Sequence, residues 1–326
     1  MGNKRMEYLD YVKGFGILLV VLGHVYAGNN YIKIWLYSFH MPLFFIISGI
    51  LIKHTNVKDR DIKNIIASKF KSLIIPYICF ELLAIFVWMV QNEFTLSALK
   101  WNITDSMLMY CKAGATWFLP CLFITEVIYL IMIKNIKNDK INVFVSLIIF
   151  LIPLILKTNN HYLIVIFRCF IAYGFVTFGY YAYDLIINKE ITFKYLIILF
   201  ILNIVLSQSN GYVDLWGLTL NNPILYTINS IIGTLFIIYT FKKIKTNLNV
   251  LKYFGVNTII IMGTQQVILD NISIHTGEQH YNYIIGTLVF IVTVLIEIPI
   301  IEIINRYMPF MIGKFKKIKK VQVMSD

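Results

Sequence analysis

Charged residues are scarce in this chain of 326 residues: Asp, Glu, Lys and Arg make up 14% of it, against 58% hydrophobic residues. A soluble domain has about 25% charged residues, because its surface must be hydrated. The mean hydropathy of +0.72 points the same way. No segment between the apolar stretches is long enough to form a soluble domain. The composition therefore predicts one integral membrane domain over residues 1–326, ending in a short basic tail over about 306–326.

Cysteines and acidic residues are also few. The four cysteines, Cys79, Cys111, Cys121 and Cys169, include no CxxC pair and no His at metal-ligand spacing, so we expect neither a disulfide framework nor a metal site. The 17 Asp and Glu against 29 Lys and Arg leave a net charge of +12. The positive charges lie between apolar runs and not on one face, which argues against nucleic acid as a partner.

Apolar runs long enough to cross a membrane recur along the whole chain. A spanning helix needs about 20 mostly apolar residues to cross about 30 Å of hydrocarbon. The sequence therefore predicts an all-α, polytopic transmembrane helix bundle with about ten spans, of which the fifth and seventh are short. The predicted spans are 11–28, 34–52, 72–91, 113–133, 141–157, 162–183, 195–208, 224–241, 255–271 and 283–304.

The distribution of Lys and Arg predicts the orientation of the bundle. With the N-terminus in the cytoplasm, 23 of the 29 Lys and Arg fall in cytoplasmic segments. The outer segments hold only 4, which are Lys33, Lys100, Lys112 and Lys157. Cytoplasmic loops of membrane proteins carry such an excess, and one missed helix would reverse the side of every later loop. We therefore expect both termini in the cytoplasm and a multi-pass protein of the cytoplasmic membrane, in contact with the lipid bilayer.

The first apolar run has a second interpretation, as a signal peptide cleaved after residues 25–27. Asp10, Lys13 and His24 interrupt or flank this run, and export signals avoid such residues. We therefore favour a first spanning helix that stays in the protein.

These same three residues share one stripe of the first span. At about 100° per residue, the step from Lys13 to His24 returns to nearly the same face, about 16 Å along the axis. Asp10 is one turn before Lys13. An ionisable residue inside a span costs about 2.5–3.5 kcal/mol on insertion, so it usually faces the interior and has a function. His24 titrates near neutral pH and is predicted to be a catalytic base. Asp10 and Lys13 either assist it or form a polar seam between helices.

Later spans add further candidate residues. His40 stands at the outer mouth of the second span, as either a second catalytic residue or an interfacial residue that caps or packs. Arg168 cannot lose its charge, so it should pair with a carboxylate or phosphate, and Glu81 and Glu126 are the candidate partners. Trp117 opens the fourth span, as either an aromatic-belt anchor or a substrate-binding residue.

Two short segments complete the set of candidates. Ser48 and Gly49, in the second span, are expected to pack helices together. The loop 53–71 carries six basic residues, including Lys69 and Lys71. These either set the topology or hold the phosphates of a nucleotide-like ligand.

Several segments resemble the acyltransferase-3 family of membrane-bound enzymes, which O-acylate cell-surface sugars. They are residues 9–14, 20–24 and 39–49. The family's signature in the first helix is an Arg or Lys followed, after ten further residues, by a His, and Lys13 and His24 match that spacing. Residues 116–119 are similar to the family's fourth-helix motif. Arg168, residues 179–180 and residues 253–257 are similar to weaker later motifs. The resemblance is specific over residues 7–51 and covers the rest of the chain in layout.

This chain departs from the family at two places. Most members have Arg where this chain has Lys13, and many have a His in the ninth span, where this chain has Gln265 and Gln266. Some members of the family carry an additional soluble, esterase-like domain. We expect this chain to be a form without that domain, which most resembles the family's sugar O-acetylase branch.

The resemblance implies a reaction and its substrates. Acetyl-CoA, or a related acyl-CoA, enters from the cytoplasm as a co-substrate, no cofactor is bound, and the acceptor is a hydroxyl of a surface or lipid-linked glycan. His24 takes the acceptor's proton or carries the acyl group, and Lys13 holds donor charge or stabilises the oxyanion. The alternatives are a transporter or flippase of a glycolipid or polysaccharide precursor and a structural or sensing membrane protein. The Ile-, Asn- and Lys-rich composition suggests a bacterial source.

Overall fold

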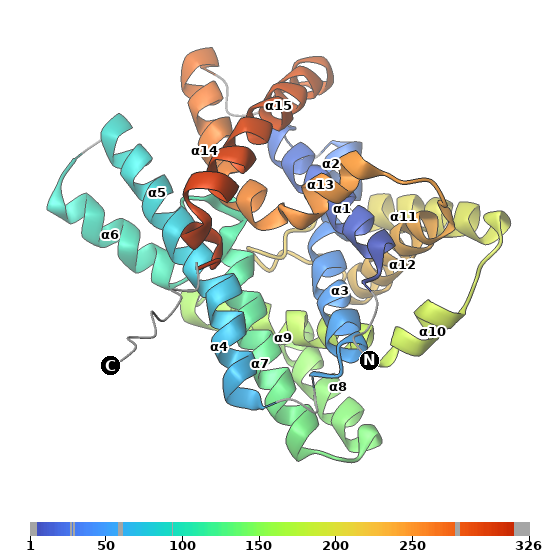
Figure 1. Cartoon of the computed structure of the whole chain (residues 1–326). Helices are drawn as coiled ribbons and strands as arrows, with labels where there is room; N and C mark the ends of the chain where they lie inside the picture. The colour runs from blue at the N-terminus through green and yellow to red at the C-terminus, as the bar shows by residue number, and fades with distance from the viewer. Residues whose placement is uncertain are drawn as a thin grey trace, which may run out of the picture.

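Helices form every regular element of the structure (Figure 1). This computed structural model describes residues 5–26, 28, 30–57, 61–92, 94–277 and 281–315. Lys4, Lys58, Arg60 and the basic tail from residue 316 lie outside the described residues. Within the described ranges, 8 helical segments are long and apolar enough to cross a membrane. The prediction of an all-α membrane bundle is therefore confirmed.

The first half of the chain contains α1 (Glu7–Val25), α2 (Tyr31–Tyr37), α3 (His40–His54), α4 (Ile62–Lys69), the π-helical turn η2 (Phe70–Ile74), α5 (Ile75–Gln91), α6 (Leu96–Met107), the 3-10 turn η3 (Gly114–Trp117), α7 (Phe118–Asn135) and α8 (Asp139–Ile155). The second half contains α9 (His161–Tyr181), α10 (Tyr183–Asn188), α11 (Phe193–Asn210), α12 (Pro223–Lys243), α13 (Asn249–Val256), α14 (Thr258–Thr276), α15 (Tyr283–Tyr307) and the 3-10 turn η4 (Pro309–Ile312).

Each of the ten predicted spans overlaps a helix, but only 8 segments are apolar and long enough to be spans by themselves. Of the other two, α8 has 17 residues, and α14 carries the polar residues Gln265, Gln266, Asp270 and Asn271. The number of spans stays a prediction. Large apolar side chains such as Phe86, Phe144, Ile201 and Leu288 are exposed on the outside of the bundle, as expected for a surface in contact with lipid.

The second predicted span is broken between α2 and α3, next to Pro42. Proline has no backbone N–H, so the carbonyl of Ser38, four residues earlier, loses its usual helical donor. The hydroxyl of Ser230 on α12 donates to this carbonyl at 2.8 Å. The break therefore places His40 at the first position of α3.

The third predicted span starts earlier than expected. Residues 62–91 form one continuous helical segment, α4–η2–α5, with the π-helical turn directly before Pro76. The interpretation of 53–71 as a loop is therefore wrong over its second half, and Lys69 and Lys71 lie on a helix. Proline again explains the irregularity, because the missing N–H of Pro76 interrupts the α-helical bonding pattern.

Glycines allow two helix pairs to approach until their backbones touch. A Cβ atom on Gly49 of α3 would lie 2.0 Å from the carbonyl oxygen of Val176 on α9, and one on Gly179 would lie 2.1 Å from that of Ile46. Gly14 of α1 and Gly255 of α13 face each other in the same way, each with a backbone carbonyl 1.9 Å from the missing Cβ. The predicted packing role of Gly49 is confirmed, and Gly255 explains part of the later family motif.

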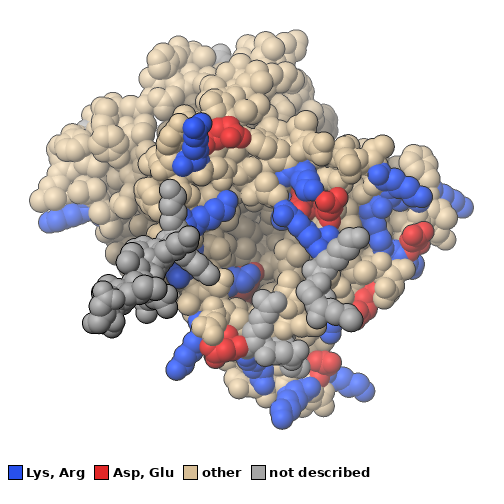
Figure 2. All heavy atoms as spheres, viewed as in Figure 1, with Lys and Arg blue, Asp and Glu red and all other residues tan. Residues whose placement is uncertain are grey.

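The bundle has two chemically different ends. Helix α1 runs from Asp10 and Lys13 at one end to His24 at the other; by the predicted orientation these are the cytoplasmic and outer ends. α1 and α3 run side by side, with α11 and α12 on one side and α7 to α9 below them in Figure 1. Figure 2 shows Lys and Arg side chains arranged around a hollow on one face of the molecule.

Candidate functional site

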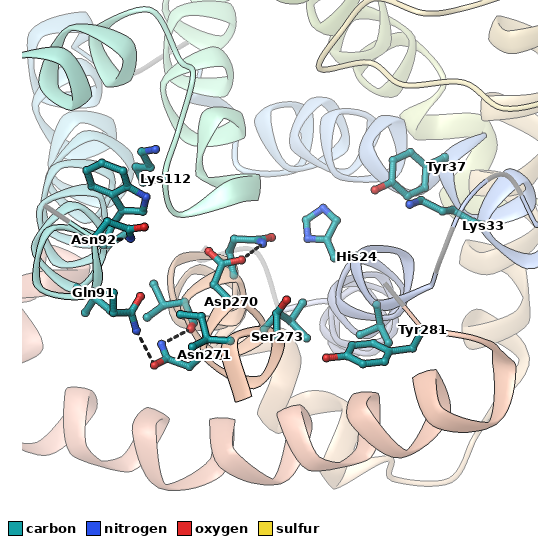
Figure 3. Close-up of a pocket in the computed structure, with 18 residues that line it drawn as sticks. His24, Lys33, Tyr37, Gln91, Asn92, Lys112, Asp270, Asn271, Ser273 and Tyr281 are labelled. Atoms are coloured by element: carbon teal, nitrogen blue, oxygen red, sulfur yellow. Dashed lines mark hydrogen bonds between the residues drawn. The ribbon is translucent and has the colours of Figure 1, made fainter. Parts of the chain in front are cut away.

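Two cavities meet at His24, near the C-terminal end of α1. The larger, drawn in Figure 3, has a volume of about 460 Å³ and is lined mainly by α1, α5 and α14. The smaller, of about 200 Å³, is lined by α3, η3 and the segment between α11 and α12. His24, Tyr37 and Gln266 line both cavities. The imidazole of His24 therefore stands where the two spaces join.

Small residues on α1 bring the neighbouring helices close enough to form these walls. A Cβ atom on Gly23 would lie 2.9 Å from the ring of Tyr37, and one on Gly16 would lie 3.1 Å from Leu43 and Phe44. Tyr37 can therefore pack against α1 directly beside His24. His24 itself is half-buried, one residue before the helix ends at Val25.

His40 lines the smaller cavity together with His24. Its Nδ1 lies 2.7 Å from the carbonyl oxygen of Leu36, and its ring packs edge-on against Tyr37 with 4.9 Å between centroids. A carbonyl only accepts, so Nδ1 must carry the proton and Nε2 is the basic nitrogen of the neutral ring. The structure therefore brings the two predicted histidines to one cavity and fixes the tautomer of His40.

Asp10 and Lys13 lie at the other end of α1, away from both cavities. The ammonium of Lys13 is 2.8 Å from the carboxylate of Asp10, which Arg5 also contacts at 2.6 Å. The stripe predicted for α1 is present, but its two ends are separated by about 16 Å along the helix. The structure therefore does not place Lys13 beside His24.

Among the described residues, Arg168 forms no ion pair with a carboxylate, and the prediction that Glu81 or Glu126 would serve is wrong. Its buried guanidinium donates to the carbonyl of Met109 at 3.3 Å. It lies 5.2, 5.5 and 5.3 Å from the rings of Tyr110, Trp117 and Trp216. Aromatic faces attract a cation, so a cage of three rings replaces the expected ion pair.

Trp117 is 5% exposed and lines the smaller cavity. An anchor in the aromatic belt would face lipid or water, so that interpretation is wrong. Trp117 instead forms part of an aromatic wall with Tyr212 and Trp216, in front of the Arg168 guanidinium.

Glu81 organises the segment that carries Trp117. Its carboxylate accepts hydrogen bonds from Ser106 Oγ at 2.9 Å, from the backbone N–H groups of Lys112 and Ala113 at 3.0 and 3.1 Å, and from the hydroxyl of Thr116. Four donors occupy its acceptor capacity. Glu81 therefore positions the wall of the site and has no acceptor position left for a ligand.

Glu126 and Lys69 form an ion pair with 2.9 Å between Nζ and Oε2. The hydroxyl of Ser48 also donates to Glu126, so Ser48 belongs to a polar network and is more than a packing residue. Lys69 lines a third cavity of about 410 Å³ at the expected cytoplasmic end, between α3 and α4. Lys71 is exposed on η2.

Three phenylalanine rings pack along α3 between this third cavity and the two cavities at His24. Phe118 packs against Phe44 and Phe45 with 5.8 and 4.7 Å between ring centroids. All three side chains are buried. The polar groups at the two ends of the bundle are therefore not continuous along α3.

The segment 211–222 supplies site residues that the sequence did not single out. Tyr212, Asp214 and Trp216 line the smaller cavity. Burial raises the pKa of Asp214, while the backbone N–H groups of Trp216 and Gly217, which donate to its carboxylate, act in the opposite direction. A lone Asp among apolar and aromatic residues in a short loop was the available signal.

The two glutamines that replace the family's ninth-span His have different environments. Gln266 lines both cavities and donates to Asp270 at 2.7 Å. Gln265 is fully buried and has no hydrogen-bond partner among the described residues. The position of Gln266 is thus part of the site although its side chain cannot act as a base.

Comparisons with known proteins bear on this geometry. A family model described as an acyltransferase domain, that of the acyltransferase-3 family, matches residues 6–302. Searches of curated proteins and of solved structures returned no match to the chain. The match covers nearly the whole chain, from the start of α1 into α15, and includes both cavities and the His24 stripe. The chain is therefore a membrane protein that belongs to the acyltransferase-3 family.

Proposed function

We propose that this protein transfers an acyl group, in the simplest case acetyl, from acyl-CoA to a hydroxyl of a cell-surface or lipid-linked glycan. One observation carries the proposal: the ring of His24 lines two cavities at once. A group-transfer enzyme must bring two substrates to one catalytic group, and a side chain shared by two adjoining spaces meets that need.

His24 acts as a general base in this scheme. It takes the proton from the acceptor hydroxyl as the hydroxyl oxygen attacks the carbonyl carbon of the thioester. The new C–O bond forms, the C–S bond breaks, and the CoA sulfur leaves as a thiolate that receives the proton. The products are the O-acylated glycan and free CoA. His40, with Nε2 as its basic nitrogen, is the second candidate for the same step.

The donor approaches from the expected cytoplasmic end. Lys13 and Lys69 lie there, and Lys69 lines the third cavity, so cationic groups are available for the phosphates of CoA. Lys13 and His24 are about 16 Å apart along α1, so in this scheme the extended pantetheine arm of CoA has to pass along α1 to bring the thioester to His24. Of the two roles expected for Lys13, its position favours holding donor charge over stabilising the oxyanion.

Thioester turnover by the purified protein tests the proposal. The protein in detergent or nanodiscs, given acetyl-CoA and a mixed glycan extract, should release free CoA thiol and produce acylated glycan detectable by mass spectrometry. The His24→Gln protein should do neither. A transporter or flippase would instead move glycolipid across vesicles without consuming acetyl-CoA, and that result would contradict the proposal.

A further inference from the structure

The larger cavity beside His24 contains two of the chain's few outer lysines. The sequence places only 4 of 29 Lys and Arg in segments expected outside. Lys33 and Lys112 belong to that small set, and both line the cavity of about 460 Å³. The other two, Lys100 and Lys157, are exposed at positions that do not line it. Because the positive-inside bias depletes basic residues from outer segments, two at one cavity indicate a local function.

Lys33 is 7% exposed. Its ammonium donates to the carbonyl of Tyr26 at 3.1 Å and lies 5.5 and 5.9 Å from the rings of Tyr37 and Tyr212. It forms no ion pair with a side chain in the described part of the chain. Burying an ammonium without a carboxylate in direct contact costs free energy. Asp214 attracts Lys33 only from a longer distance, and a bound anion would recover more of that cost.

Lys112 enters the same cavity from the opposite wall. Its ammonium lies 4.4 Å from the ring of Trp88, and it too has no ion-pair partner among the described side chains. Figure 3 shows Lys112 and Lys33 on opposite sides, with His24 and Asp270 between them. The carboxylate of Asp270 accepts a hydrogen bond from Gln266. The carboxylate of Asp214, in the smaller cavity, also attracts Lys33, but no carboxylate forms an ion pair with either ammonium group among the described residues.

The volumes and linings of the two outer cavities indicate which substrate each holds. Binding sites for small molecules have volumes of about 300–1,000 Å³. The larger cavity, at about 460 Å³, falls in this range and has amides such as Gln91, Asn92 and Asn271 that can bond sugar hydroxyls. The smaller, at about 200 Å³, is lined mainly by aromatic and apolar residues, with His40, Asp214 and Gln266 as its further polar groups, and its size suits a short acyl group.

We propose that the larger cavity is the acceptor site and that Lys33 and Lys112 select a glycan that carries an anionic group, a carboxylate or a phosphate. That the bound glycan is the acceptor of the acyl group rests on the proposed function. The anion site itself is inferred from the two lysines and the cavity alone. An anionic group held between the two ammonium groups leaves neighbouring hydroxyls of the glycan beside His24.

Binding of small anions to the purified protein, without any acyl-CoA, tests the site separately from turnover. Ligand-observed NMR titrations would use glucuronate and glycerol phosphate, with glucose and glycerol as neutral controls. Both anions should bind more tightly than their neutral counterparts, and added salt should weaken them. The tighter of the two anions identifies the acidic group as carboxylate or phosphate.

Matched variants locate the binding. Lys112→Gln and Lys33→Gln should each weaken anion binding about tenfold, the loss of one charge-assisted hydrogen bond. Lys112→Arg should retain it, and Lys100→Gln and Lys157→Gln should leave the Kd unchanged. Because Lys33 is buried, the thermal stability of its variant is measured in parallel, and Lys112→Gln carries the test if that variant unfolds.

Three results would overturn the inference. The first is equal binding of glucuronate and glucose. The second is an equal Kd for the anions in Lys112→Gln and Lys100→Gln. The third is a Lys33→Gln or Lys112→Gln protein whose KM for acetyl-CoA rises while its anion binding is unchanged. The last would assign the lysines to the donor's phosphates. Anion binding that persists in a protein without thioester turnover would refute the proposed function and leave the site in place.

Discussion

The ammonium of Lys13 lies 2.8 Å from the carboxylate of Asp10, one turn earlier on α1, and Arg5 contacts the same carboxylate at 2.6 Å. Asp10 thus has two cationic partners. A change at Lys13 removes one of them and leaves the other, so the buried carboxylate does not become unpaired.

This arrangement permits a clean test of Lys13. Lys13→Arg should retain most of the transfer activity, because Arg keeps the positive charge and can still contact Asp10. Lys13→Ala should raise the KM for acyl-CoA about tenfold, the cost of one lost charge-assisted contact. Steady-state kinetics on the purified proteins measures both. Arg5→Gln is the matched control, since it removes the other partner of Asp10 and should leave the donor KM nearly unchanged; an equal KM for Lys13→Ala and wild type would assign Lys13 to the polar seam.

His24 is expected to carry the proton transfer. His24→Ala and His24→Gln should each lower kcat by at least about 100-fold, the lower range for a lost general base. Both should reach the membrane in normal amounts, because His24 lies at a cavity wall. Transfer assays with quantified membrane protein measure this. A well-made His24→Gln protein with near-normal transfer would falsify the scheme, and His40 would then be the leading candidate.

The ion pair between Lys69 and Glu126 should contribute to stability besides any contact of Lys69 with the donor, and a second substitution should restore the stability lost with the pair. Lys69→Gln leaves the buried carboxylate of Glu126 with Ser48 alone, at a cost of about 2 kcal/mol in stability. Adding Glu126→Gln removes the uncompensated charge and should recover most of that loss.

Thermal unfolding in detergent compares Lys69→Gln and Glu126→Gln with the double variant. Lys71→Gln is the control. Because Lys71 is exposed, this substitution should change the donor KM without changing the unfolding temperature. A double variant less stable than Lys69→Gln would exclude the pairing as the cause.

The orientation of the bundle can be tested by reporter fusions. Reporters that follow Lys134 at the end of α7, or Lys243 at the end of α12, should be active in the cytoplasm. A reporter placed within 209–222, between α11 and α12, should be active outside. Inverted activity at either cytoplasmic site would contradict the ten-span arrangement and, with it, the outer position of the two cavities.

Much of the fold could be predicted from the sequence, because hydrocarbon thickness and backbone hydrogen bonding restrict a long apolar run to one structure. Irregular positions were harder. Pro42 and Pro76 are visible in the sequence, but the donor to the Ser38 carbonyl that Pro42 releases is the hydroxyl of Ser230, which comes from a distant helix. The helix α6 was missed because its residues are too polar for a span and the segment was expected to be a loop.

The sequence could indicate a candidate site residue where an ionisable side chain interrupts a single apolar helix, as His24 does in α1. It was not predictable where residues from distant segments converge. Arg168 was expected to pair with a carboxylate, yet Tyr110, Trp117 and Trp216 surround it from three other elements. The expectation that a buried cation pairs with a carboxylate cannot show which aromatic rings the fold will place against the Arg168 guanidinium.

The rings of Phe44, Phe45 and Phe118 pack between the cavity at one end of α3 and the two cavities at the other. Under the proposed function, with a donor from one side of the membrane and an acceptor site at the opposite end of the bundle, the protein has a second requirement besides catalysis, which is electrical insulation. A continuous file of water along α3 would let protons flow down their gradient at every turnover and dissipate the membrane potential. The buried packing of these three rings would interrupt such a file along α3 and so keep the two ends of the bundle electrically separate.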